Sequence, residues 1–222
     1  PEAPDLGAFW ENLRLGRDSI TEIPADRWSL EGFYDPEGAG LATSRSKWGG
    51  FLEGADRFDP LFFRISPKEA ETLDPQARKF LEVVWSTLED AGRPPSRLRS
   101  ETVGVFVGVM YGEYQLIGAE ELARGNVVGP NSAYWQIANR VSYFLDLDGP
   151  SLAIDSACSS SLTAIHLACQ SLWSGDATVA IAGGVNLSVH PWKYLVLSRS
   201  GFASTDGRCR SFGAGGDGYV PG

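Results

Sequence analysis

The sequence is poor in the residues that metal and redox sites need. Its 222 residues include only two histidines, three cysteines and one methionine. No two of the cysteines have the spacing of a metal-ligand pair, and three cysteines cannot all pair within one chain. We therefore expect no metal site, free thiols and a reducing compartment such as the cytoplasm.

Long apolar runs and an excess of positive charge are also missing. No stretch approaches the ~20 apolar residues that span a bilayer, and residues 1–5 lack the basic patch and apolar core of a signal peptide. The net charge of −9 disfavours nucleic acid and anionic membranes as partners, because both bind clustered positive charge. Arg93, Arg97 and Arg99 do cluster, but among two prolines and a serine, which indicates a solvated loop.

Several familiar catalytic motifs are absent. The chain has no P-loop, no G-x-S-x-G elbow and no H-E-x-x-H pair. Residues 213–218 fit the G-x-G-x-x-G pattern of dinucleotide sites, but that fingerprint must open a helix, and the proline of Tyr219-Val220-Pro221 disfavours one. We reject nucleotide binding and expect a flexible glycine-rich turn after Phe212.

What is present indicates an alternating α/β chain with a core. The hydrophobic content of 43% is ordinary for a globular protein, and the length allows one large domain. Periodicity and turn signals predict three helices, over 7–15, over 67–91 and from a cap at Asn131 through about 144. They also predict buried strands over 102–110, 151–154 and 177–185. Residues 24–50 are predicted to form a loop region. The helix over 67–91 should present one apolar face, made by Phe80, Leu81, Val84, Trp85 and Leu88.

The most informative segment joins a predicted buried strand, Ser151–Ile154, to an amphipathic helix through a cysteine. Apolar residues recur at helical spacing up to Gly175, where the helix should stop: Leu162, Ile165, Ala168, Cys169 and Leu172. Cys158 would then lie at the helix N-terminus, where the dipole favours a thiolate and backbone N–H groups could stabilise an acyl oxyanion. The arrangement is typical of a nucleophile for thioester chemistry, although an arbitrary cysteine is more often a small structural residue.

Other nucleophile candidates are weaker. Ser159, Ser160 and Ser161 would each need an adjacent base, and none is evident, whereas a thiolate is nucleophilic by itself. Cys169 falls on the apolar face of the same helix and is expected to pack in the core. Cys209 lies between two arginines, and we interpret it as mainly structural.

Residues 155–166, Asp-Ser-Ala-Cys-Ser-Ser-Ser-Leu-Thr-Ala-Ile-His, resemble the active-site segment of β-ketoacyl synthases, specifically the ketosynthase domains of bacterial modular polyketide synthases. The resemblance continues in order along nearly the whole chain, over residues 9–13, 18–28, 48–51, 73–76, 103–108, 138–143, 182–186 and 206–212. Residues 108–116 and 212–218 are most similar to assembly lines whose acyltransferase is a separate protein.

The resemblance implies the thiolase-like fold, in which two similar α/β halves pack as a layered α-β-α-β-α sandwich. Residues 1–222 would be the N-terminal half of a ketosynthase domain, truncated at both ends, without its first strand and without a second half that carries two histidines. We then expect unpaired sheet edges at 102–110 and 177–185.

The resemblance also implies decarboxylative Claisen condensation with Cys158 as the catalytic nucleophile. An upstream acyl carrier protein loads the acyl chain onto Cys158, and a malonyl unit on the downstream carrier loses carbon dioxide and attacks the thioester. No cofactor is implied, because the phosphopantetheine belongs to the carrier. The further expected partners are neighbouring synthase domains and a second copy in a homodimer, with Val128–Trp135 bordering the acyl tunnel near the dimer seam.

The two histidines of this chain are not expected to do this chemistry. His166 should lie beside the apolar stripe as a packed or hydrogen-bonded structural residue, and His190 should lie in a loop before Pro191. Three alternatives stay open: a non-elongating domain that only passes the acyl chain on, a non-catalytic partner subunit, which usually lacks the cysteine, and a cysteine hydrolase, which needs a positioned histidine and a water path.

Overall fold

A computed structural model describes residues 1–127 and 129–222. The chain forms two compact units, one made of Ala55–Asn186 and the other of Pro1–Gly54 with Leu187–Gly222. Among the described residues, no helix is both long enough and apolar enough to cross a membrane.

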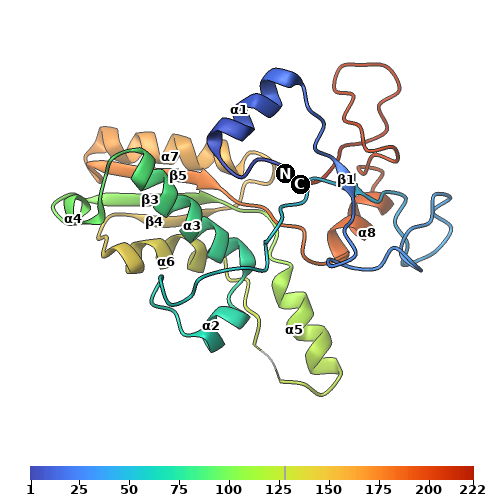
Figure 1. Ribbon diagram of the computed structural model, residues 1–222, viewed down its shortest axis with the longest axis horizontal. Coiled ribbons are helices and arrows are strands. Elements are labelled where there is room, and N and C mark those ends of the chain that lie inside the picture. Colours follow the sequence, from blue (N-terminus) through green and yellow to red (C-terminus); the bar gives the residue numbers. More distant parts are fainter. Residues whose placement is uncertain (128) are drawn as a thin grey trace. The chain divides into compact units, whose positions relative to one another are not determined.

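The unit of residues 55–186 is built on a parallel sheet of three strands in the order β4-β3-β5 (Figure 1). The central strand β3, Val103–Gly108, is buried over its whole length. It pairs in parallel with β4, Ser151–Ile154, on one side and with β5, Val179–Gly184, on the other. The predicted strands and their parallel direction are therefore confirmed, whereas the expectation of an unpaired edge at 102–110 is wrong because β3 lies in the centre.

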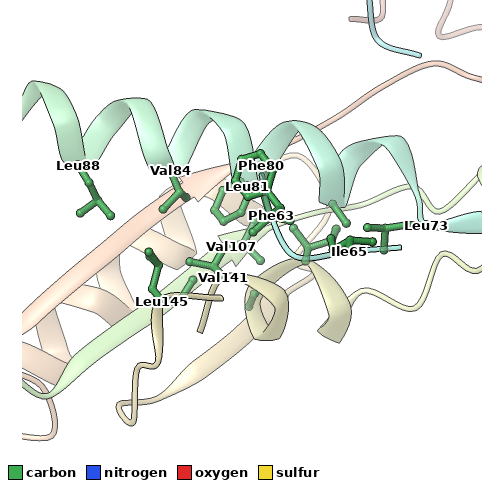
Figure 2. Close-up of a cluster of buried hydrophobic side chains, with 14 of the residues drawn as sticks. Phe63, Ile65, Leu73, Phe80, Leu81, Val84, Leu88, Val107, Val141 and Leu145 are labelled. Atoms are coloured by element: carbon green, nitrogen blue, oxygen red, sulfur yellow. The ribbon is translucent and has the colours of Figure 1, made fainter. Parts of the chain in front are cut away.

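Helices cover both faces of this sheet. In Figure 1, α7 (Ser160–Ser174) lies on one face, and α3 (Pro75–Asp90) and α6 (Trp135–Leu145) lie on the other. Alternation along β3 explains the layers, since Val103, Val105 and Val107 belong to the core under α3 and α6, whereas Phe106 packs against α7. Figure 2 shows the larger core, in which Leu81 and Val84 of α3 lie beside Val141 and Leu145 of α6 and Val107 of β3.

The helix predicted over 67–91 is two helices, α2 (Pro67–Thr72) and α3. Pro75 explains the break, because it has no N–H to donate and it disfavours a helical conformation of the residue before it. That residue, Asp74, instead accepts a hydrogen bond from the Gln76 N–H and caps α3. The predicted apolar face is confirmed, with four of its five residues buried and Trp85 partly buried.

Three further expectations for this unit need correction. Asn131 does not cap α6, which begins four residues later; its side chain instead accepts a hydrogen bond from the Ala133 N–H. Strands β4 and β5 are only partly buried, because each has one neighbouring strand among the described residues. The segment that contains Arg97 includes a short helix, α4 (Pro95–Leu98), rather than only loop.

Most of the predicted stripe on α7 does not face the sheet, since of its five residues only Ala168 is buried and Cys169 is partly buried. Leu162 is 72% exposed and Ile165 is 48% exposed, whereas the buried face of the helix is made of small side chains: Ser160, Ala164, Ala168 and Ser171. Small residues let the helix approach the sheet closely, so they determine which side of α7 packs inward. Helix α5 (Tyr114–Ala123) was not predicted at all.

The other unit has little regular structure. It contains α1 (Leu6–Leu15), α8 (Trp192–Arg199) and a two-stranded antiparallel sheet of β1 (Thr21–Glu22) and β2 (Trp48–Gly49). Its core lies around the buried Tyr194, whose hydroxyl donates to the Trp48 carbonyl. Residues 213–218 form a bend, a turn and irregular structure, and no helix follows them in the described part of the chain.

Candidate active site

The carboxyl ends of all three parallel strands meet at one edge of the sheet. The last residue of β3, Gly108, is in register with Ile154 of β4 and with Gly184 of β5. Ligands and reactive side chains commonly lie at this edge of parallel sheets. The segment after β4 carries Cys158, and the segment after β3 carries Tyr111.

Cys158 lies on a tight turn two residues before the start of α7, as the sequence predicted. It is an exposed, free cysteine. The preceding residue, Ala157, has a φ of 56°, the left-handed conformation that L-residues other than glycine seldom adopt. Its N–H donates to the Asp155 carboxylate at 3.0 Å, which closes a local turn directly after β4.

Serine hydroxyls hold the turn together from the helix side. The Oγ of Ser160 accepts the N–H of Ser156 at 3.0 Å and donates to the carbonyl of Ala157 at 2.6 Å. The Oγ of Ser159 donates to the Ser156 carbonyl at 2.8 Å, and the Ser156 and Thr163 hydroxyls lie 2.9 Å apart. The hydroxyls at positions 159 and 160 therefore donate to backbone carbonyls.

Two glycines allow α7 to start directly against the sheet. A Cβ on Gly108 would lie 2.5 Å from the amide nitrogen of Ser161 and 2.6 Å from the carbonyl carbon of Ser160. A Cβ on Gly184 would collide with the hydroxyl of Ser161. Real Cβ atoms do not come this close to other heavy atoms, so the position of the helix start depends on Gly108, whose neighbours are backbone atoms, whereas the Ser161 hydroxyl beside Gly184 can rotate.

The segment after β3 carries Tyr111, whose hydroxyl interacts electrostatically with Cys158. Burial raises the pKa of the Tyr111 hydroxyl above its usual value, and negative charge at Cys158 raises it further. Two hydrogen bonds to carbonyls hold this segment, from the Gln76 side chain to Tyr111 and from the Tyr134 hydroxyl to Met110, each at 2.7 Å. Sequence reasoning missed Tyr111; its place three residues after a buried strand was the signal that could have found it.

The two histidines and the two other cysteines are in different surroundings from Cys158. His166 is exposed on α7, and no hydrogen bond to it is seen among the described residues, so the expectation of a packed or hydrogen-bonded histidine is wrong. His190 lies in a loop, as predicted, and its Nδ1 accepts the Trp192 N–H. Cys169 is partly buried and Cys209 is exposed. Of the predicted tunnel segment, Val128 lies outside the described residues.

The local arrangement can support nucleophilic chemistry at sulfur. An exposed thiol sits beside the N-terminus of a 15-residue helix, whose first amide groups are the natural place to stabilise a developing oxyanion. Within the part of the chain that the structure describes, no group of three or more His, Cys, Asp and Glu side chains is placed to hold a metal ion.

Comparison with known sequences identifies the family. The family model described as "Beta-ketoacyl synthase, N-terminal domain" matches residues 1–222. Polyketide synthase ThaG of Burkholderia thailandensis is 58% identical over 221 residues, and polyketide synthase PksL of Bacillus subtilis is 55% identical over 229 residues. Each match covers the whole chain, but the chain spans only 4% of ThaG and 5% of PksL.

Solved structures agree with this assignment. The oxazolomycin ketosynthase domain OzmH KS7 of Streptomyces albus superposes with a TM-score of 0.96 at 58% identity, over 100% of this chain and 38% of that domain. The ketosynthase from module 6 of the bacillaene synthase of Bacillus subtilis has a TM-score of 0.87 at 38% identity, over 100% of this chain and 36% of that one. The chain therefore belongs to the β-ketoacyl synthase family, and it has the fold of the N-terminal part of a thiolase-like ketosynthase domain.

Proposed function

We propose that residues 1–222 are the N-terminal half of a ketosynthase domain in a modular polyketide synthase, and that Cys158 carries the growing acyl chain. The observation that carries the proposal is the position of Cys158: a free, exposed thiol on a tight turn between β4 and the N-terminus of α7. Cys169 and Cys209 have no such position, since Cys169 lies in the third turn of α7 and Cys209 in a loop of the other unit.

The proposed reaction has two steps. In the first, the Cys158 thiolate attacks the acyl thioester on an upstream carrier protein, a new carbon–sulfur bond forms, and the phosphopantetheine thiolate leaves. In the second, a malonyl unit on the downstream carrier loses carbon dioxide, and the resulting carbanion attacks the carbonyl carbon held on Cys158. The Cys158 thiolate leaves, and a β-ketoacyl chain remains on the downstream carrier.

The residues around Cys158 would serve this reaction in distinct ways. Both steps pass through a tetrahedral intermediate whose oxygen carries negative charge, and the amide groups at the start of α7 are the proposed donors to it. Two histidines from the C-terminal half would orient the malonyl thioester, because the chain's own His166 projects from α7 into solvent. No redox or metal step is required, since decarboxylation itself supplies the carbanion.

The exposed apolar surfaces fit the proposed partners. The stripe of Leu162, Ile165 and Leu172 on α7 is 42–72% exposed, and it is the surface that the second half would cover in a layered fold. Strand β4 has one free edge within the described part of the sheet, and Leu152 on it is 45% exposed. We propose this edge as the contact with a second copy in a homodimer, within a cytoplasmic, multidomain synthase.

The test is to locate the acyl group by intact-protein mass spectrometry. The complete ketosynthase domain is incubated with an acyl thioester of a carrier protein, and the same is done with Cys158→Ala, Cys169→Ala and Cys209→Ala. We expect stoichiometric acylation of the wild type and of the last two variants, and none of Cys158→Ala. Acylation of Cys158→Ala at the wild-type level would overturn the assignment.

A further inference from the structure

The side chain of Ser160 connects both ends of the turn that carries Cys158. Ser160 is only 5% exposed. Its Oγ accepts the N–H of Ser156 and donates to the carbonyl of Ala157, the two consecutive residues before Cys158. The backbone N–H of Ser160 donates to the same Ala157 carbonyl at 3.1 Å. One buried hydroxyl therefore fixes the two residues that precede Cys158.

Those contacts hold a conformation that alanine avoids. At a φ of 56°, the Cβ of Ala157 crowds its own backbone, so without external contacts this residue would relax toward negative φ. Such a rotation directly before Cys158 would swing the Cα–Cβ bond of the cysteine to a new direction. Ala157 itself is exposed, so packing does not prevent the rotation.

The backbone of Ser160 is packed against the sheet, so its position is fixed. The carbonyl carbon of Ser160 lies against Gly108 at the end of the central strand, so close that a Cβ there would not fit. The backbone of Ser160 thus packs against Gly108, while its hydroxyl forms hydrogen bonds with Ser156 and Ala157 of the turn. We propose that Ser160 is a positioning residue: it keeps Ala157 left-handed and so aims the Cys158 Sγ at the incoming thioester. This inference rests on the proposed role of Cys158.

The first test compares two reagents on the complete ketosynthase domain. Iodoacetamide is small and can approach an exposed thiol from many directions, whereas acyl transfer from a carrier protein requires one direction of attack. A misplacement of about 1 Å can cost about 100-fold in rate. We expect Ser160→Ala to lower the rate of acyl loading by about 10- to 100-fold and to leave the rate of alkylation by iodoacetamide within about twofold of the wild type.

Ser171→Ala is the matched control. Ser171 lies on the same buried face of α7, and its hydroxyl has no hydrogen-bond partner in the described part of the chain. Removing it deletes the same atom from a similar environment without touching the turn. We expect Ser171→Ala to load the acyl chain at the wild-type rate.

Two variants of Ala157 test the mechanism directly. Glycine adopts positive φ without a steric cost, so Ala157→Gly added to Ser160→Ala should recover most of the lost loading rate. A β-branched residue strongly disfavours positive φ, so Ala157→Val should lower loading although Ser160 is intact. The second variant keeps the proposal testable if Ser160→Ala fails to fold.

The outcomes separate this inference from the proposed function. If the wild type is not acylated on Cys158, the proposed function fails. If the wild type is acylated but Ser160→Ala or Ala157→Val loads at the wild-type rate, only the positioning role is overturned. Equal losses of loading and alkylation, or no rescue by Ala157→Gly, would also overturn it, because both results indicate a general loss of structure rather than a misdirected thiol.

Discussion

A methyl group added at Gly108 should disturb the active-site turn from the sheet side. Gly108 does not have a positive φ, so an alanine can adopt its backbone conformation, and the only cost is contact. The new Cβ would lie 2.5 Å from the amide nitrogen of Ser161, whereas ordinary contacts begin at 3.4 Å. The start of α7 must therefore move by about 0.9 Å, the difference between the two distances.

This displacement has two measurable effects. Overpacking of this kind typically lowers the free energy of unfolding by about 1–3 kcal/mol. The shift also moves Ser160, which holds the turn before Cys158, so we expect Gly108→Ala to lower the rate of acyl loading by about 100-fold. Urea unfolding gives the first quantity, and mass spectrometry of quenched loading reactions with the complete domain gives the second.

Gly183→Ala in the neighbouring strand is the control. A Cβ there would lie 3.2 Å from Cε2 of Phe80, so this ring has to shift by only about 0.2 Å to reach an ordinary contact. It should cost less stability than Gly108→Ala and should leave the loading rate unchanged. The reasoning is refuted if Gly108→Ala loads at the wild-type rate, or if both variants slow loading equally.

Two further predictions concern the buried carboxylate and the isolated chain. Burial raises the pKa of Asp74 in the folded protein, despite hydrogen bonds from Ser132 and Gln76. The protonated carboxyl therefore contributes stability that is fully present below the unfolded-state pKa of about 3.9. This contribution is lost as pH rises through the folded-state pKa. Asp74→Asn, which is neutral at every pH and can still cap α3, should therefore gain stability relative to the wild type between about pH 4 and about pH 7; a difference in urea midpoint that does not change with pH would contradict this. Residues 1–222 expressed alone should release no carbon dioxide from malonyl carrier protein. The reason is that His166 is exposed and lies roughly 12 Å from Cys158 along the helix axis. A folded monomer that forms β-ketoacyl product would disprove this prediction.

The sequence was sufficient to place Cys158 but not to describe its turn. A strand, a cysteine and a helix ending at Gly175 follow from local patterns, and all are present at the predicted positions. The left-handed conformation of Ala157 does not follow, since alanine is not a residue that signals positive φ. Ala157 is held by hydrogen bonds with Asp155 and Ser160, and Ser160 is itself packed against Gly108 of the sheet.

The errors elsewhere have similar causes. The predicted apolar stripe of α7 includes Leu162, Ile165 and Leu172, but the face that packs on the sheet is made of small residues, of which Ala164 and Ala168 contact the large Phe106 of β3. The apolar periodicity of residues 67–91 continues across Pro75, but the proline divides the segment into α2 and α3. The central position of β3 depends on strand order, which local patterns do not specify.

The most direct test of the account follows the acyl chain from Cys158 to the carrier. The complete domain is loaded with an acyl group, freed of donor, and mixed with malonyl carrier protein, and the masses of both proteins are recorded over time. The account predicts that the acyl mass leaves the peptide containing Cys158 while a β-ketoacyl chain appears on the carrier with release of carbon dioxide. Release of the free acid, or transfer of the unchanged acyl group to the carrier, would contradict it and would indicate a hydrolase or a non-elongating domain instead.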